Sequence, residues 1–533
     1  MDSQSLIVLG NAYLKVWLDP ATGRIMAVHN VPRDLDLVSA VLDTPPWRLE
    51  VQPEGRWIES FGSFSYEVGD SGSEGQRATL RWETEAGISL VSIITVPADE
   101  PAVLLTIAVE NTGGLAIDKI EYPIVTGIGP LGARRLPTAL VHSQGTGFLF
   151  RDPLATFLPE EGPRQGLRFS PYPEGFSGST MQFMAYYAEE RGGFYFATRD
   201  AGKAMKWLNS YKDIASGLLT ASFMHQAPHV ASGQSFAPDY PVEISALFEG
   251  TWYEAAERYK AWAIRQPWTQ QGPLAQRTDR PKWLHEDVGI CTFGINAAHD
   301  RSEWLDAFHK AAGTPVFHIL GPNWARSGQD YMGTLPGGAI TDWVPGRFSH
   351  ANLDTIRRNG DRWAPFEFDL LCSHSSSRPE PVLQCRQVLP ARKYSFDRYT
   401  FPFMCPATPF WHDLHVARDA RIVAEHDPDA IYYDISLNNV LMACRSQHHP
   451  HHPGGGQEIA DAYARMLADT KAEIARVAGR PVAIGTEMVT ELVIPFVDFY
   501  QARAEASPAS SFEADFWRKW LIEGKVEKIP LFA

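Results

Sequence analysis

The sequence predicts a protein of two parts, an N-terminal β-sandwich followed by a barrel of the TIM (β/α)8 type. Two observations carry this prediction. Residues 1–245 consist of short β-type runs separated by turn residues, whereas strand-like and helix-like runs alternate from residue 283 onwards. A chain of 533 residues is also too long for one hydrophobic core, so two or three domains are expected.

The first 245 residues are expected to form an all-β domain. Residues 12–18, 78–82 and 103–109 alternate apolar and polar side chains or are rich in β-branched and aromatic ones. Turns rich in Gly and Asp separate such runs, for example at residues 19–23 and 69–75. Many short strands at this spacing predict a β-sandwich.

Residues 246–282 are expected to link the two domains. Trp252, Tyr259 and Trp262 recur at helical spacing, which predicts an amphipathic helix over residues 250–263. The polar residues that follow this helix predict an irregular connection.

Residues 283–533 are expected to form the barrel. Strands that alternate with helices predict parallel pairing through βα units, and a doubly wound sheet is the second interpretation. No glycine fingerprint follows the first strand, which weighs against a nucleotide-binding sheet. The predicted strands are residues 287–294, 315–320, 365–371, 430–434, 481–485 and 496–500, and the predicted helices include residues 302–312, 412–426 and 456–479.

The C-terminal residues 525–533 look like the start of another strand, which would be the seventh of the barrel. A closed eight-stranded barrel would then lack its last unit. The favoured interpretation is a truncated chain, or a barrel completed by a second polypeptide or in a homo-oligomer. The alternative is that residues 529–533 are only a closing tail.

Composition excludes some partners. The net charge is -15 and no long basic run occurs, so neither nucleic acid nor an anionic membrane surface is expected as a partner. The 16 Trp residues fit stacking on sugar rings, but they fit an ordinary large core equally well. No signal peptide or membrane-length apolar run is visible, so a cytoplasmic protein is expected.

The cysteines do not predict a disulfide framework. The chain has five of them, all in its second half and without a CxxC pair. An odd number without regular spacing is typical of reduced thiols. They are Cys291, Cys372, Cys385, Cys405 and Cys444.

Two predicted strands end in a carboxylate. Asp434 follows Ile-Tyr-Tyr, and Glu487 follows Val-Ala-Ile-Gly-Thr on the next strand. Strand C-termini face the active site in a barrel, and a carboxylate pair is the minimum equipment for cleaving a glycosidic bond. The alternatives are a helix N-cap for Asp434 and a solvated loop for Glu487. Glu491 and Asp498 compete with Glu487 for the acid/base role.

Several other polar or aromatic side chains are expected to bind substrate. Asp369 shares a strand face with Glu367, and a structural ion pair is an equally good explanation for either. Asn323 and Trp324 offer an amide and a stacking ring, unless they anchor a buried loop. The further candidates lie after the predicted nucleophile or on the sixth strand, and they are Asn438, His449, His451, Asp498 and Arg503.

The histidine-rich loop at residues 448–456 raises the question of a metal. A structural zinc site needs two spaced ligand pairs, and a catalytic one needs three converging ligands. The prolines of this loop are expected to hold the chain extended, so that adjacent histidines diverge. We therefore predict no metal or cofactor, and expect His449 or His451 to contact the substrate or the nucleophile.

The chain resembles known families of carbohydrate enzymes. Residues 14–25 resemble the start of galactose-mutarotase-like domains. Residues 250–263, Tyr433-Asp434 and the His-Pro-Gly-Gly-Gly loop are similar to the DUF6259 group of bacterial proteins. That group resembles barrels of the endo-α-N-acetylgalactosaminidase, α-amylase and α-galactosidase type. The resemblance implies a nucleophile on strand four and a Glu acid/base on strand five, as Asp434 and Glu487 stand here. In α-galactosidase barrels the second carboxylate is an Asp on strand six, which corresponds to Asp498.

The resulting hypothesis is a retaining glycosidase that acts on α-linked sugars. Retention requires the two carboxyl groups about 5–5.5 Å apart, and inversion requires roughly 6.5–9.5 Å. Two alternatives stay open at this point: a non-catalytic carbohydrate-binding protein with an incomplete barrel, and a metal-dependent hydrolase that uses the histidine loop.

Overall fold

A computed structural model describes most of the chain. The described residues are 6–70, 75–131, 137–158, 165–175, 178–321, 348–370, 384–388, 403–434, 436, 444–454, 456–501, 526–529 and 531.

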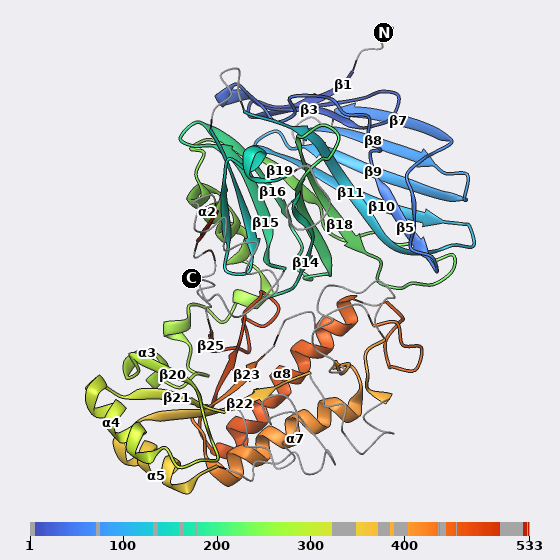
Figure 1. Ribbon diagram of the computed structural model, residues 1–533. Helices are drawn as coiled ribbons and strands as arrows, with labels where there is room; N and C mark the ends of the chain where they lie inside the picture. The colour runs from blue at the N-terminus through green and yellow to red at the C-terminus, as the bar shows by residue number, and fades with distance from the viewer. Residues whose placement is uncertain are drawn as a thin grey trace. The chain divides into compact units, whose positions relative to one another are not determined.

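The chain divides into two compact units. The first comprises Met1–Pro267 and Arg503–Ala533, and the second comprises Trp268–Ala502 (Figure 1). The boundary near residue 267 lies within the predicted linker, where short 3-10 turns occur at Pro267–Thr269 and Leu274–Gln276. No helix among the described residues is long and apolar enough to span a membrane.

The first unit is built from antiparallel sheets, as its alternating sequence pattern predicts. A ten-stranded sheet has the order β26 (Val526–Lys528), β13 (Phe148–Arg151), β12 (Thr138–Gln144), β15 (Ser179–Ala188), β16 (Gly192–Thr198), β19 (Val242–Leu247), β10 (Ala102–Asn111), β9 (Ile88–Val96), β8 (Gln76–Glu83) and β7 (Ser63–Asp70). A six-stranded sheet has the order β14 (Gly166–Tyr172), β17 (Lys206–Lys212), β18 (Leu219–Gln226), β11 (Ala116–Ile128), β5 (Arg48–Gln52) and β6 (Arg56–Ile58). A smaller sheet joins β1 (Ile7–Gly10), β2 (Leu14–Leu18), β3 (Ile25–Asn30) and β4 (Leu35–Asp36). The short helix α1 (Pro153–Thr156) follows β13.

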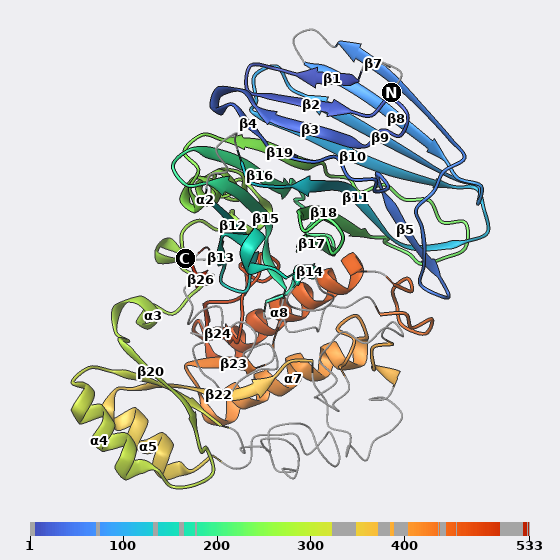
Figure 2. The same ribbon diagram turned by 45° about the horizontal axis from the view of Figure 1, so that its top comes forward.

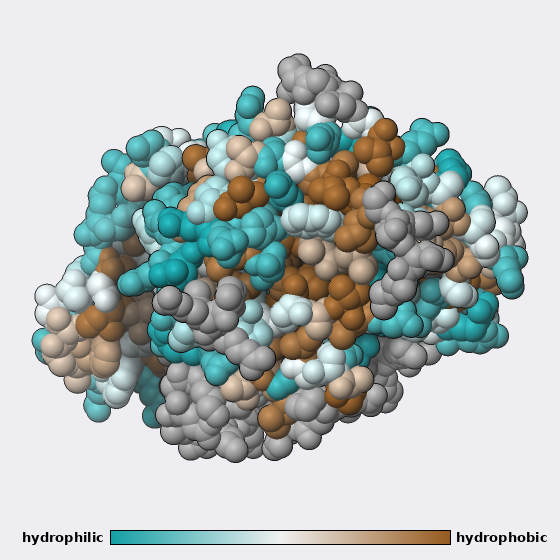
Figure 3. Space-filling model, turned by 90° about the horizontal axis from the view of Figure 1, so that it is seen from above, coloured by the Kyte–Doolittle hydropathy of each residue, from teal (hydrophilic) through white to brown (hydrophobic). Residues whose placement is uncertain are grey.

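Strands from all three sheets contribute to one large apolar core, which includes Trp47, Trp82 and Phe223. The alternating burial of β9 shows how its sequence pattern builds this core, because every second side chain is buried. Figure 3 shows hydrophobic residues in patches between hydrophilic ones on the face seen from above. Exposed apolar side chains of this unit include Val8 on β1 and Val68 on β7.

Helix α2 (Trp252–Ala263) is the predicted amphipathic helix. The Thr251 hydroxyl accepts a hydrogen bond from the Glu254 amide at 3.1 Å, and the Glu254 carboxylate accepts bonds from backbone amides that precede the helix, including that of Gly250 at 2.9 Å. This reciprocal capping begins the helix. Tyr259 then stacks on Phe183 of β15, with ring centroids 4.8 Å apart.

The prediction for the C-terminal strand was wrong. Strand β26 does not extend the parallel sheet; it pairs antiparallel with β13, with Phe148 opposite Lys528. The Ile529 side chain is buried in an apolar cluster with Leu149 and Tyr187. The edge of β13 presents backbone N–H and C=O groups to which another segment can bond. A short segment can pair there without an alternating apolar pattern, so the sequence does not reveal its partner.

In the part of the second unit that the structure describes, six parallel strands form a sheet in chain order. They are β20 (Ile290–Ile295), β21 (Val316–Leu320), β22 (Arg362–Phe368), β23 (Ala430–Asp434), β24 (Ala483–Thr486) and β25 (Phe499–Tyr500). The helices among the described residues are α3 (Trp283–Glu286), α4 (Ser302–Ala312), α5 (His350–Asn359), α7 (Pro409–His426) and α8 (Gly456–Ala478).

The predicted βα alternation is confirmed, and the sheet curls as half of a barrel would. Figure 2 shows β22, β23 and β24 side by side, with α7 and α8 running along them. Each predicted strand overlaps an observed one, whereas α5 was not predicted. The described residues do not show a closed eight-stranded barrel, so the finer prediction of a TIM barrel is not established by them.

Candidate active site

The register of β23 against β24 places the two predicted catalytic carboxylates next to each other. Ala430 pairs with Ala483 and Tyr433 with Thr486, so one further step brings Asp434 opposite Glu487. The Glu487 amide continues this pairing by donating to the Tyr433 carbonyl at 2.9 Å. Since neighbouring strands lie about 4.8 Å apart, the two backbones are close at the C-terminal ends of both strands.

Asp434 lies on the inner face of the curled sheet. Side chains of a strand alternate between faces, and Tyr432 belongs to the apolar cluster that fills the inner face. The Tyr432 hydroxyl lies 3.2 Å from Asp434 Oδ1 and 2.8 Å from Gln501 Oε1. Asp434 and Glu487 are both buried. Neither is a solvated loop residue, which was the alternative considered for Glu487.

Aromatic rings line the same inner face. Phe293 of β20 lies 5.4 Å from both Phe366 and Tyr432 between ring centroids, and the Phe366 ring in turn lies 5.6 Å from that of Tyr432. Phe293 is 43% exposed although its neighbours are buried. An exposed ring beside the carboxylate strand could stack on the apolar face of a sugar. Phe293 could not be recognised from the sequence, because one Phe in a predicted strand is indistinguishable from a core residue.

The opposite face of the sheet holds a buried charge network. Arg418 of α7 lies 2.7 Å from Glu367 and 2.5 Å from Asp419, and the Tyr433 hydroxyl donates to Asp419. Burial raises the pKa of Glu367. Burial also opposes ionisation of Asp419, but the charge of Arg418 outweighs it and lowers the pKa of that carboxyl. These partners favour the structural ion pair as the explanation for Glu367.

Asp369 directly follows β22 and faces α8. Its carboxylate accepts a hydrogen bond from Tyr463 and lies within reach of Ser436, and burial raises its pKa. The Asp369 carbonyl accepts from Trp411 Nε1 at 3.1 Å. A role for Asp369 in substrate binding stays a prediction.

Asp498 precedes β25 and is surrounded by positive charge. Its Oδ1 lies 2.9 Å from Arg280 Nε and 2.6 Å from Lys471 Nζ, and its Oδ2 accepts from the Ile484 amide at 2.9 Å. Two buried ion pairs and a bond from a backbone amide suit a structural carboxylate better than a general acid. Glu491 is buried, but residues 487–490 do not form the helix that would align it with Glu487. Glu487 therefore stays the preferred acid/base candidate.

Four further candidates cannot be placed. Asn323, Trp324, Asn438 and Arg503 lie outside the described residues, so their roles stay predictions.

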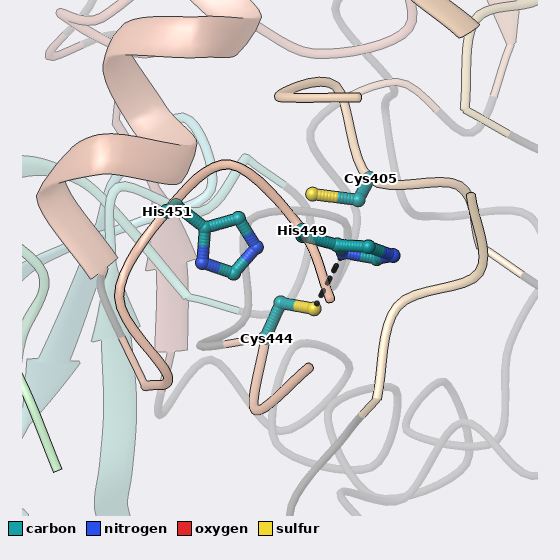
Figure 4. Close-up of side chains that lie close together, drawn as sticks. All are labelled: Cys405, Cys444, His449 and His451. Atoms are coloured by element: carbon teal, nitrogen blue, oxygen red, sulfur yellow. Dashed lines mark hydrogen bonds between the residues drawn. The ribbon is translucent and has the colours of Figure 1, made fainter. Parts of the chain in front are cut away.

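Two histidines of the loop that are not adjacent in sequence converge on one cluster, which the sequence did not predict. His449 and His451 approach each other with ring centroids 5.4 Å apart, and His449 Nδ1 lies 3.4 Å from Cys444 Sγ (Figure 4). Cys405, which comes from the segment before α7, completes a cluster whose potential ligand atoms all lie within 4.8 Å of one another. The sequence does not link Cys405 to this cluster, because Cys405 lies more than forty residues before the histidine loop and no regular spacing connects them.

Comparison with known proteins places these features in a family and a fold. The profile of a domain of unknown function, DUF6259, matches residues 236–532, more than half of the chain. A search of the curated proteins returns no match.

Two solved structures of an α-N-acetylgalactosaminidase, NagBb from Bifidobacterium bifidum, are similar to this chain. The complex with Gal-NHAc-DNJ has a TM-score of 0.69 at 13% identity, and the match covers 99% of this chain and 82% of that one. The complex with GalNAc has a TM-score of 0.67 at 12% identity with the same coverage. The chain therefore belongs to the DUF6259 family, and it shares its fold with NagBb.

Proposed function

We propose that this protein is a retaining glycoside hydrolase acting on α-linked sugars, with a galactose-mutarotase-like sandwich and a TIM-type catalytic barrel. The observation that carries the proposal is the register that pairs two buried carboxylates, Asp434 and Glu487, at neighbouring strand ends. The fold shared with an α-N-acetylgalactosaminidase supports it. It also makes aryl α-N-acetylgalactosaminides the first substrates to test.

In the proposed mechanism, Asp434 attacks the anomeric carbon and forms a glycosyl ester while the bond to the leaving oxygen breaks. Glu487 gives its proton to that oxygen. Glu487 then takes a proton from water, and the water oxygen attacks the anomeric carbon and releases Asp434. These roles require an ionised Asp434 and a protonated Glu487 at the start of the reaction, and the Tyr432 hydroxyl lies where it can donate to Asp434.

The proposal is tested with a panel of aryl α- and β-glycosides and the variants Asp434→Asn and Glu487→Gln. We expect turnover of α-glycosides by the parent protein and a loss of at least about 100-fold in kcat for each variant. Asp354→Asn and Glu303→Gln make the same chemical changes at exposed positions of α5 and α4, so they should keep the parent rate.

The leaving group separates the two roles. A weakly basic aryl oxide needs little protonation as it departs, so the defect of Glu487→Gln should shrink with such substrates, while that of Asp434→Asn should persist. Sugar binding without turnover by the parent protein would instead support the non-catalytic alternative. Equal defects of both variants on every leaving group would overturn the assignment of roles.

A further inference from the structure

The side chains of Cys405, Cys444, His449 and His451 form a cluster with the composition of a metal site (Figure 4). Both thiols are fully buried, and His451 is only 9% exposed. Two thiols and two imidazoles are soft or borderline donors, which suit zinc. Calcium and magnesium are hard cations and prefer oxygen ligands.

The distances are close to those that zinc requires. Zinc–sulfur bonds of about 2.3 Å and zinc–nitrogen bonds of about 2.0–2.1 Å place tetrahedral ligand atoms about 3.3–3.8 Å apart. The Sγ of Cys444 and the Nδ1 of His449 are 3.4 Å apart, and every pair in the cluster lies within 4.8 Å. The remaining ligands therefore need to move by only about 1 Å to complete a tetrahedron.

Both imidazoles turn a free nitrogen towards the cluster. His449 Nε2 lies 2.6 Å from the Gln384 carbonyl, which fixes a proton there and leaves the Nδ1 lone pair for a ligand. His451 Nδ1 lies 2.9 Å from the His452 carbonyl, which does the same for Nε2. That Nε2 is buried and, apart from the Cys444 thiol, has no hydrogen-bond partner among the described residues.

The backbone holds the cluster in place without the metal. The Gly454 amide donates to the Cys444 carbonyl at 2.9 Å and closes the loop that carries both histidines. The Val388 amide donates to Cys444 Sγ at 3.3 Å, an arrangement that stabilises a thiolate. The Cys405 amide is anchored on the Cys385 carbonyl at 2.7 Å.

We propose that these four side chains bind one structural Zn²⁺. Four protein ligands leave no open position for a substrate or a water, so the site is structural and is not the centre of a metal-dependent hydrolase. The ion would tie the segment before α7 to the loop before α8, the two segments that follow β22 and β23 in the chain. This assigns His449 and His451 to the metal, and the proposed substrate site must then do without them.

Metal content and spectroscopy of the full chain test this proposal. We expect one zinc per chain by mass spectrometry after purification with reductant. Addition of Co²⁺ to the chelated protein should give the visible bands of a tetrahedral thiolate site. Zinc should raise the melting temperature of the chelated protein by several degrees, and Cys405→Ser/Cys444→Ser should lose binding and this shift. Cys291→Ser, at an exposed cysteine of β20, should retain both.

Two results would overturn the proposal. One is a folded parent chain that takes up neither Zn²⁺ nor Co²⁺ while its thiols are free. The other is a disulfide between Cys405 and Cys444 that persists in reductant. Because the cobalt spectrum is measured on the parent chain, misfolding of the double variant would not obscure the answer, and glycosidase activity is not needed for any readout.

Discussion

The Asp434 side chain contacts a residue of its own strand, Tyr432. Tyr432 lies two residues earlier on the same face, and its hydroxyl reaches the Asp434 carboxylate. Tyr433 points to the other face and bonds to Asp419 in the charge network behind the sheet. Two adjacent tyrosines thus have separate tasks, one at the proposed nucleophile and one in the packing of α7.

Tyr432→Phe tests the first of these tasks. A hydrogen bond to a charged group contributes about 1.5–3 kcal/mol, so its loss should lower kcat about 10- to 100-fold if Asp434 is the nucleophile. KM should change little, because the hydroxyl is not proposed to touch the sugar. The matched control is Tyr433→Phe. This variant should lower the free energy of unfolding and leave kcat nearly unchanged. An unchanged kcat in Tyr432→Phe would remove this residue from the site.

At the scale of elements, α7 is fixed to the sheet by charge as well as by apolar packing. Arg418 is fully buried between Glu367 of β22 and its own neighbour Asp419. Removing one partner of a buried ion pair leaves the other charge uncompensated, which costs far more than the pair itself contributes.

Arg418→Met should therefore destabilise the second unit by about 3–5 kcal/mol. Glu367→Gln added to this variant should recover part of the loss, since it removes one uncompensated carboxylate. Arg421→Met removes an exposed ion pair with Glu425 on the same helix, and it should cost less than about 1 kcal/mol. Urea unfolding measures all three. Equal effects of the two single variants would show that burial of Arg418 is unimportant.

At the scale of the whole molecule, the chain returns to its first unit at the C-terminus. Strand β26 pairs with β13, and Ile529 packs into the apolar cluster beneath α2. The C-terminal segment is therefore expected to stabilise the sandwich and not the parallel sheet.

Ending the chain at residue 525 tests this expectation. The loss of one buried Ile and of the strand pairing should lower the stability of the first unit by about 2–5 kcal/mol, while kcat on an active glycoside is retained. Calorimetry and the aryl-glycoside assay measure the two effects. Ile529→Ala is the milder version and should reproduce part of the destabilisation. Loss of activity with unchanged stability would instead make these residues part of the barrel.

Much of this architecture follows from residues that are close in sequence. The alternation in β9 and the spacing of apolar residues in α2 are local patterns, and a strand or helix buries one face accordingly. Asp434 and Glu487 are predictable because each follows a strand-like run, and the strand end fixes where such a side chain lies.

Features that depend on partners distant in sequence could not be predicted from local patterns. The pairing of β26 with β13 depends on which sheet edge is available. A three-residue strand is too short for a sequence pattern that would identify its partner. Phe293 gains its place beside Tyr432 from the curl of the sheet. Cys405 meets Cys444 because the segments that precede α7 and α8 in the chain come together, which no local spacing encodes. Short-range periodicity sets each element, whereas contacts between elements are selected by the packing of the whole unit.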